Sequence, residues 1–493
     1  MHQRIFICAD HGLALIYFLQ SEVVSTLLNA DLEVVLLTDD ALVEGVQQRF
    51  GRDRLTIEGL RVSQASAYAN QNAAELQWWG NFLRRVGTSN RINTQAMDSH
   101  VWQVSVEAGR KRRLLMPLAR AILGLLRRSQ RARQLLVNAQ KRYNPMLYAD
   151  LFDRYRPRLV VASTYGWRQD RYLLREAEAR GVKIAAVIVG WDNPSSYGLP
   201  AARIDWVTCW SQIQKDELTQ GGPWPADRVN IGGIPSYDGY FRREWLMPRD
   251  EYFRLHGLSP ERKLLSYAAS FVSFAPNFRN VETLAKLVAS NDLAVPAQLL
   301  IRLHPNHFMD NPLYAREREK IRQLARELPN VHVVEPVPLG GSLSYYSGED
   351  MPEKSSMMAY SDVFLTVYST MVVECGIHER PIVSVCLDTP GGWNTPQKFS
   401  LPLSQIGDWP THSRFRASGG GRVALDESQL KEAINRYLQD PAADLERLRT
   451  FIRLECTYTD GCAGKRSGEW LASLLCNSLS LDWVLSDAAI CEI

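Results

Sequence analysis

Several patterns that mark common classes of protein are absent from this chain of 493 residues. No run of about 18 uninterrupted apolar residues occurs, so the sequence predicts no membrane-spanning helix. The eight cysteines include no CxxC pair and the nine histidines no HExxH motif, so neither a metal nor another bound cofactor is expected. The N-terminal residues lack the small-residue cleavage site of a signal peptide, which predicts a cytoplasmic protein.

A strong imbalance of charge is also missing, because 57 Lys and Arg face 54 Asp and Glu and leave a net charge of +3. Nucleic acid is therefore not an expected partner. The chain is too long for one hydrophobic core, so two domains are expected. We place them at residues 1–250 and 251–476, followed by a tail of residues 477–493. Strands alternating with helices predict an α/β fold with two Rossmann-like domains facing a cleft.

The first unit opens with an apolar strand, residues 4–8, that runs into Asp10, His11 and Gly12. A helical stretch over residues 13–28 and a strand over residues 32–38 complete a βαβ unit. No GxGxxG motif follows the first strand, so the dinucleotide fingerprint is missing. Asp10 and His11 instead occupy the first functional loop of this unit. Further strands are predicted at residues 158–163, 184–189, 206–210 and 229–231.

A strongly basic segment, residues 110–142, is inserted in this first unit. Basic amphipathic helices of this kind bind anionic bilayers, which makes a membrane surface a candidate partner. The alternative is a solvated helix that packs its leucines on its own domain, and Pro117 and Gly124 interrupt the helical pattern. The segment has no Asp or Glu, and its basic residues are Arg110, Lys111, Arg112, Arg113, Arg120, Arg127, Arg128, Arg131, Arg133, Lys141 and Arg142.

The second unit is organised around residues 299–381. Residues 299–306 form an apolar strand that delivers Arg302 and His304 at its end, and a second strand follows at residues 331–334. Residues 361–374 begin as a strand, break at Ser369 and Thr370, and continue as a helix. The next strand begins at residue 380. Since ligands of parallel sheets lie outside the carboxyl ends of the strands, we treat His304, Ser369 and Thr370 as one site.

An imidazole and two hydroxyls at a helix start suit a pyrophosphate or phosphodiester group. Glu374 lies on the same helix, where it is expected to face the ribose hydroxyls of a nucleotide. The alternatives are that His304 is an ordinary hydrogen-bonded residue and that Ser369 and Thr370 cap the helix.

These motifs, taken in order, resemble those of bacterial surface-polysaccharide enzymes of the GT-B glycosyltransferase fold. The resemblance includes the CDP-glycerol glycerophosphotransferases and the Kdo and sialic acid transferases. It implies that His304, Ser369 and Thr370 contact the phosphate of a nucleotide-sugar donor. The second domain is also similar to UDP-N-acetylglucosamine 2-epimerases, which carry a His-Pro-Asn run. Those epimerases have Asp-Ser-Gly-Gly where this chain has Tyr-Ser-Thr-Met at residues 368–371.

Sugar transfer needs a base near the acceptor hydroxyl and stabilisation of the departing phosphate. Asp10 or His11 is the expected base, with Asp192 as the second choice, although Asp10 and His11 are equally placed to cap the first helix. Arg302, Lys465 and Arg466 are further candidates for contacts with the donor. No DxD pair ends a convincing strand, and the expected transfer uses no metal.

The expected function is transfer of a sugar from a nucleotide-activated donor to a glycan or lipid-linked acceptor in surface glycan assembly. The expected location is the cytoplasm, with a peripheral position on the inner face of the cell membrane through the basic segment. Three alternatives stay open: a sugar-nucleotide epimerase, a CDP-alcohol phosphotransferase, and a nucleotide-binding scaffold without activity.

Overall fold

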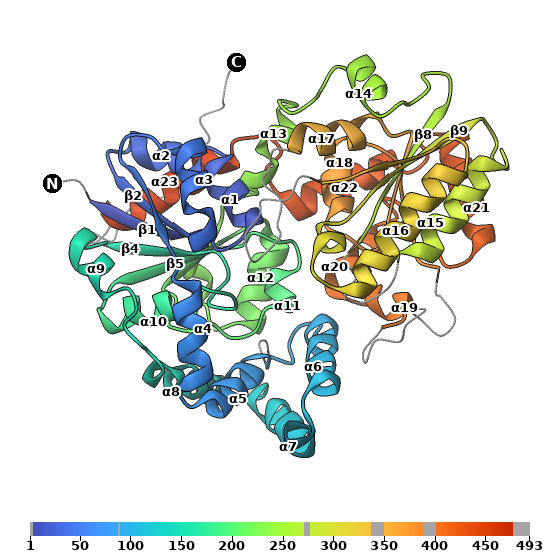
Figure 1. The fold of residues 1–493 in the computed structure, drawn as a ribbon. Helices are drawn as coiled ribbons and strands as arrows, with labels where there is room; N and C mark the ends of the chain where they lie inside the picture. The colour runs from blue at the N-terminus through green and yellow to red at the C-terminus, as the bar shows by residue number, and fades with distance from the viewer. Residues whose placement is uncertain (1–2, 87–88, 271–276, 337–349, 388–400, 477–493) are drawn as a thin grey trace.

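The structure, a computed structural model, describes residues 3–86, 89–270, 277–336, 350–387 and 401–476 (Figure 1). Its described strands form two separate parallel sheets with helices packed around each, which confirms the α/β class and the two Rossmann-like units. The predicted tail of residues 477–493 lies outside the described residues.

The first sheet contains seven described strands, and all its pairings are parallel. β1 lies between β2 and β4, with Phe6 opposite Val35 on one neighbour and Val160 on the other. Its strands are largely buried, because helices on both faces shield a parallel sheet from water. In spatial order the strands are β3 (Leu55–Gly59), β2 (Glu33–Thr38), β1 (Arg4–Cys8), β4 (Leu159–Ala162), β5 (Lys183–Val187), β6 (Trp206–Cys209) and β7 (Val229–Ile231).

The second sheet repeats this arrangement with six described strands. Its central strand is β8, where Leu265 lies opposite Leu299 and Val363. The strand order reverses between β8 and β11, as it does between β1 and β4, and open α/β sheets bind ligands at such switch points. In spatial order the strands are β10 (Val331–Val334), β9 (Ala297–Arg302), β8 (Lys263–Ala268), β11 (Val363–Thr366), β12 (Ile382–Val385) and β13 (Arg422–Ala424).

Two edge strands, β3 and β13, were not predicted from the sequence. β3 has exposed and half-buried residues between its buried ones, and β13 has three residues, so neither carries a long apolar run. The single helix predicted over residues 13–28 is two helices, α1 and α2. The chain turns between them at Ser21, whose Oγ accepts a hydrogen bond of 3.2 Å from the backbone N–H of Val23.

Helices follow most strands and connect the two units. Those up to the last strand of the first sheet are α1 (Gly12–Leu19), α2 (Val23–Asn29), η1 (Asp40–Leu42), α3 (Val43–Phe50), α4 (Val62–Gln71), α5 (Ala74–Arg84), α6 (Gln95–Glu107), α7 (Arg110–Leu126), α8 (Gln130–Ala139), η2 (Gln140–Arg142), α9 (Ala149–Tyr155), α10 (Arg171–Ala179), α11 (Asn193–Ser196), α12 (Gln212–Gly221) and η3 (Ala226–Arg228).

The helices after β7 cover the second sheet, with the exceptions of η4 and α13, which lie at the junction of the two units, and of α23, which packs on α2 of the first unit. They are η4 (Pro235–Tyr237), α13 (Asp238–Phe241), α14 (Arg249–Leu255), α15 (Phe278–Ala289), η5 (Pro305–Phe308), α16 (Pro312–Glu327), α17 (Met351–Tyr360), α18 (Met371–Ile377), α19 (Leu403–Ile406), α20 (Pro410–Ser418), α21 (Glu427–Gln439), α22 (Leu445–Cys456) and α23 (Ala463–Cys476).

Helices α4 to α8 form the insertion between β3 and β4, and α5 to α8 project away from both sheets (Figure 1). This insertion has a small core of its own, which includes Phe82, Val101, Met116, Ala119 and Leu123. Helices α5 to α8 therefore pack as a separate layer, whereas α4 packs on the first sheet through Ala65.

Helix α23 belongs to the first domain in space, although the sequence prediction assigned residues 463–476 to the second. It packs on α2 (Figure 1), and Leu471 and Leu475 join the core of the first sheet. Close packing depends on two small residues of α23. A Cβ at Gly464 would lie 2.7 Å from the backbone N of Glu22, and one at Gly468 would lie 2.9 Å from the carbonyl oxygen of Val23. The contacts thus move α23 out of the predicted second domain.

No helix among the described residues is by itself long and apolar enough to span a membrane. Together α1 and α2 reach the required length and composition, but they meet at a bend of 42°. Most of their side chains are buried within the first domain.

Candidate active site

Asp10 and His11 lie just beyond the end of β1, at the switch point of the first sheet. Both side chains are buried, and Nδ1 of His11 lies 2.6 Å from Oδ1 of Asp10. His11 begins α1, but its side chain makes no capping hydrogen bond. The ring is thus held by the neighbouring carboxylate, which the capping alternative did not anticipate.

The protonation of this pair follows from its surroundings. Burial disfavours the charge of Asp10, but the hydrogen bond from His11 and attraction to Arg168 hold the pKa of Asp10 below its ordinary value. Burial lowers the pKa of His11, and this effect outweighs the opposing influence of Asp10. Because a carboxylate only accepts hydrogen bonds, Nδ1 of the neutral His11 ring carries the proton. Nε2 is consequently the basic nitrogen.

Residues after β4 complete this end of the first sheet, and sequence reasoning missed them. The hydroxyl of Ser163 donates to Asp10 over 3.1 Å, and the backbone N–H of Gln169 donates over 3.2 Å. Nearby Asp170 accepts from Thr164 over 2.8 Å. Ser163 ends a predicted strand beside that of Asp10, and its position at the shared sheet edge was the available signal.

Ligand atoms of Cys8, Asp10 and Asp170 lie within 4.8 Å of one another, which makes them the candidate metal group of the described residues. Burial raises the pKa of the Cys8 thiol well above its ordinary value, so the thiol stays protonated. Both carboxylates already accept hydrogen bonds from protein groups. These three residues therefore fit a buried polar network better than a metal site.

Asp192, the second candidate for the base, follows β5 and precedes α11. Burial raises the pKa of its carboxyl group, although a hydrogen bond with Ser196 opposes the shift. The same loop places Trp191, whose ring is fully buried. Asp192 thus lies two strands away from β1 in the sheet, while Asp10 and His11 lie at the switch point itself.

His304 follows β9 in the second sheet, and its hydrogen bond at Nδ1 has the opposite direction to that of His11. Its Nδ1 accepts a hydrogen bond of 3.1 Å from the backbone N–H of Asn306. Because a backbone N–H only donates, the proton of the neutral ring lies on Nε2. Burial and the nearby Arg302 and Lys354 lower the pKa of His304 to about 3, so the ring is neutral at physiological pH.

A buried network fixes the loop that carries His304. Nδ1 of His307 accepts from the backbone N–H of His304 over 3.1 Å, and its Nε2 lies 3.0 Å from Glu317. The other oxygen of Glu317 accepts from the backbone N–H of Asn277 and of Phe278, at the start of α15. Glu317 therefore joins the loops that follow β8 and β9.

Arg302, predicted to contact the donor, is instead buried in a protein ion pair. Its guanidinium contacts the carboxylates of Asp350 and Glu353, at the start of α17. Arg302 thus holds α17 against β9, and its charge reaches His304 only through space.

Lys354 and Tyr240 are functional candidates that sequence reasoning missed. Nζ of Lys354 lies 2.5 Å from the carboxylate of Glu374, which also accepts a hydrogen bond of 2.7 Å from the hydroxyl of Tyr240. Glu374, predicted to face a ribose, is buried in these contacts. The positive charge of Lys354 also contributes, after burial, His307 and Arg302, to the low pKa of His304.

Ser369 and Thr370 lie where β11 ends and α18 begins, as the sequence predicted. Oγ of Ser369 accepts a hydrogen bond of 3.3 Å from the backbone N–H of Met371, so Ser369 also fits the capping alternative. Thr370 precedes the helix without a side-chain cap. Both residues are partly exposed, and the preceding Tyr368 has a positive φ of 34°, which turns the chain sharply at this point.

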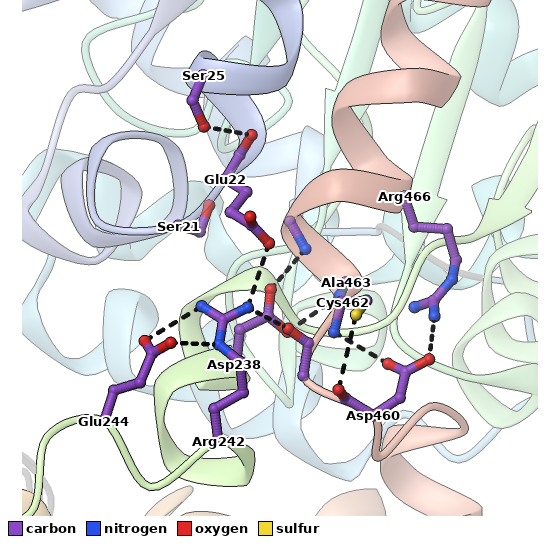
Figure 2. A network of polar contacts seen from close by, with 12 residues as sticks. Ser21, Glu22, Ser25, Asp238, Arg242, Glu244, Asp460, Cys462, Ala463 and Arg466 are labelled. Atoms are coloured by element: carbon purple, nitrogen blue, oxygen red, sulfur yellow. Dashed lines mark hydrogen bonds and ion pairs between the residues drawn. The ribbon is translucent and has the colours of Figure 1, made fainter. Parts of the chain in front are cut away.

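Lys465 and Arg466 are on α23, beside the first domain. Arg466 contacts the carboxylate of Asp460 (Figure 2), and its guanidinium lies 3.9 Å from the ring centre of Tyr458. Asp238 accepts hydrogen bonds from the backbone N–H groups of Ala463 and Gly464 and so caps α23. Neither Lys465 nor Arg466 is among the charged groups that shift the pKa of His304. A contact of either residue with the donor stays a prediction.

The carboxyl ends of the two sheets face each other through aromatic contacts. The His412 ring lies 5.7 Å from that of Trp191, which follows β5, and 5.1 Å from that of Tyr368, which follows β11. Nε1 of Trp191 donates to Glu455 of α22 over 2.8 Å. Arg414 pairs with Glu455 at 2.7 Å and with Glu217 of α12 at 2.9 Å. The two candidate half-sites therefore belong to opposed edges.

Comparison with known proteins agrees with this arrangement. No family model matches the chain. A teichoic acid ribitol-phosphate primase of Bacillus spizizenii is 21% identical over 244 residues, which are 49% of this chain and 52% of the primase. The chain thus spans about half the length of the curated relative that it matches.

Solved structures match over nearly the whole chain. The UDP-GlcNAc 2-epimerase of Neisseria meningitidis, bound to UDP-GlcNAc, has a TM-score of 0.52 and 13% identity, covering 96% of this chain and 100% of the epimerase. The MnaA protein of S. aureus, solved with UDP, has a TM-score of 0.51 and 12% identity, covering 96% and 97%. At such identities the likeness concerns the fold alone. The chain therefore has the GT-B fold, with two opposed Rossmann-like units, that its motifs predicted.

Proposed function

We propose that this protein is a glycosyltransferase that moves a sugar from a nucleotide-activated donor to a hydroxyl of a glycan or lipid-linked acceptor. The observation that carries the proposal is that two neutral histidines, at opposed sheet edges, carry their ring proton on different nitrogens. His11 presents a basic nitrogen, because its Nδ1–H is committed to Asp10. His304 presents an N–H, because its Nδ1 accepts from the backbone. Transfer needs one group of each kind.

In the proposed step, the acceptor oxygen forms a bond to the anomeric carbon of the donor sugar. Nε2 of His11 takes the proton of the acceptor hydroxyl, and Asp10 stabilises the resulting imidazolium. The bond between the anomeric carbon and the phosphate oxygen breaks, and the electron pair stays on the nucleotide phosphate. Nε2–H of His304 and the ammonium of Lys354 stabilise that charge, with the hydroxyls of Ser369 and Thr370 as further donors.

No metal ion takes part in this scheme, because protein cations and N–H groups meet the departing charge. Turnover is therefore expected to persist in excess EDTA. Loss of turnover that returns with added Mg²⁺ would contradict this part of the proposal. The cytoplasmic location and the identity of the acceptor stay predictions.

A second candidate, transfer of an alcohol phosphate from a CDP-linked donor, is favoured by the name of the ribitol-phosphate primase. The same half-sites suit it, but the acceptor oxygen would then attack phosphorus and the product would retain phosphate. The solved epimerases favour a third candidate, in which a UDP-sugar changes without any acceptor. A scaffold without activity would bind nucleotides and turn over none of them.

One sequence of experiments separates these four cases. Thermal unfolding with CMP, CDP, UDP or GDP identifies the donor base, because a ligand that binds the native state raises Tm. Matching donors are then incubated alone, with NMR detection of an epimerised sugar, and with acceptor, with mass spectrometry of the product. A product that gains sugar without phosphate supports the proposal. A product that contains phosphate would identify a phosphotransferase instead. Reaction of the donor alone would identify an epimerase, and binding without turnover would identify a scaffold.

A further inference from the structure

Helix α7 carries an apolar face that the protein leaves uncovered. Leu114, Leu118 and Leu125 are 83%, 62% and 64% exposed, and their spacing of four and seven residues puts them on one side of the helix. The insertion is packed by the other side, where Met116, Ala119 and Leu123 are buried. Leu123 therefore packs on its own domain, as one alternative from the sequence required, whereas Leu114, Leu118 and Leu125 face away from it.

Such exposure is concentrated in this part of the molecule. The large apolar side chains that are exposed include Leu114, Leu115, Leu118 and Leu125 on α7 and Leu135 on the neighbouring α8. Isolated exposed leucines are ordinary, but a row of them on one helix face marks an interaction surface. Figure 1 places α7 at the outer end of the insertion, away from both sheets.

The charges around this face select the kind of partner. Arg110 and Lys111 precede the leucines on α7, Arg128 follows just beyond the end of the helix, and all three side chains are exposed. Residues 110–142 hold no carboxylate that would repel an anionic surface. Arg112 and Arg127 belong to the inner side, where they pair with Glu75 and Asp98. Cations at both ends of an apolar stripe match a layer of anionic headgroups over acyl chains.

A groove beside the leucines is also lined by both apolar and basic side chains. It encloses about 600 Å³ between α6 and α7, with Trp102, Val106 and Met116 among its apolar lining residues and with Arg113 and Arg120 beside them. Trp102 is 40% exposed, and tryptophan favours the boundary between headgroups and acyl chains. The groove thus continues the amphipathic surface from α7 onto α6.

We propose that the outer face of α7 docks this protein on an anionic lipid bilayer, with Leu114, Leu118 and Leu125 inserted below the headgroups. Arg110, Lys111 and Arg128 contact the lipid phosphates. The inference stands apart from the transfer reaction, since it concerns only the surface of the insertion.

The test is flotation of the full chain with vesicles of phosphatidylcholine alone or with about 30% phosphatidylglycerol, at low and high salt. We expect flotation with the anionic vesicles, and weaker flotation at high salt because ions screen the basic residues. Replacing Leu114, Leu118 and Leu125 together by Ser is expected to reduce the bound fraction about tenfold or more. These residues are exposed, so an unchanged circular dichroism spectrum and Tm are expected for the variant.

A matched control replaces three equally exposed leucines elsewhere, Leu255, Leu425 and Leu454, which are 60%, 53% and 58% exposed. This control should float like the unchanged protein. Failure of the unchanged protein to float with anionic vesicles would overturn the proposal, and so would equal losses in the two triple variants. Sedimentation without lipid tests the other occupant. A dimer that the Leu114, Leu118 and Leu125 variant abolishes would assign this face to a second copy of the chain.

Discussion

His11 follows β1 at the switch point of the first sheet, and His304 follows β9, the strand beside β8 in the second sheet. The hydrogen bonds at Nδ1 nevertheless place the ring proton on opposite nitrogens of the two histidines. A carboxylate beside His11 fixes the proton on Nδ1, whereas a backbone N–H beside His304 keeps Nδ1 unprotonated. Their surroundings lower the pKa of both rings, so both are neutral near pH 7. One residue type thus supplies a base in one domain and a hydrogen-bond donor in the other, and the neighbour of Nδ1 decides which.

The largest expected effect on kcat comes from replacing the carboxylate that fixes the proton of His11. Asp10→Asn places an amide where the carboxylate stabilises the imidazolium, so kcat is expected to fall about 10²- to 10⁴-fold. Nucleotide binding, measured by thermal shift, should stay unchanged. Asp39→Asn is a control at the same sheet edge, since Asp39 follows β2 and its carboxylate accepts from the backbone N–H of Ala41. Equal kcat values for both variants would remove His11 from the reaction.

The two histidines can act together only if the carboxyl ends of the two sheets stay opposed. Arg414 stabilises this arrangement through its ion pairs with Glu217 and Glu455. Arg414→Met leaves Glu217 and Glu455 without their shared cation, and we expect a loss of about 2–4 kcal/mol in the free energy of unfolding. Arg416→Met is the matched control on the same helix. Arg416 pairs with Asp408 at the surface, so its loss should cost at most about 1 kcal/mol in chemical denaturation. Similar losses in both variants would argue against a tie between the domains at Arg414.

Replacing His304 tests whether this residue binds the phosphate of the nucleotide donor. His304→Ala is expected to weaken nucleotide binding about 10- to 100-fold, because a hydrogen bond to a charged phosphate is lost. His304→Gln should recover part of the affinity, since its amide again offers an N–H. His11→Ala should leave nucleotide affinity unchanged, which calorimetric titration can measure. If the two alanine variants weaken binding equally, the division of roles between the histidines is wrong.

The smallest effect concerns pH. His11 must be neutral to accept a proton, and its pKa lies below the ordinary 6.5, so kcat/KM should rise with pH only below about 6.5 and be level above it. Asp10→Asn removes an anion that raises the pKa of His11, so its residual activity should show the rise at still lower pH. His304, with a pKa of about 3, adds no step between pH 5 and 8. A rise centred above pH 7 would exclude a neutral His11 as base.

Central strands such as β1 were predictable because they are buried on both faces and consist of continuous apolar runs. The edge strands β7 and β10 also have the predicted bounds, and the residues that follow β1, β9 and β11 were correctly expected at the ends of strands. The edge strands β3 and β13 were missed because polar residues interrupt β3 and because β13 has only three residues. Sequence pattern therefore specified where the candidate residues lie along the strands.

Partnerships between distant residues were not predictable in the same way. Tyr240 and Glu374 are 134 positions apart in the chain, and Trp191 and Glu455 are 264 apart. Nothing local to Arg302 indicates that α17 supplies its carboxylates, and Lys354 lies in a helix without a recognisable motif. The order of the sheets can be read from one strand at a time, whereas ion pairs depend on how whole layers pack.

The return of α23 to α2 affects how the protein is made. During synthesis, α2 leaves the ribosome more than 400 residues before α23, which covers it. Until then, the apolar residues that later meet Leu471 and Leu475 lack their partners. The first domain therefore cannot finish folding when residue 250 emerges, and a fragment ending there would carry an uncovered apolar face. The second domain is therefore translated before the first domain can complete its core with α23.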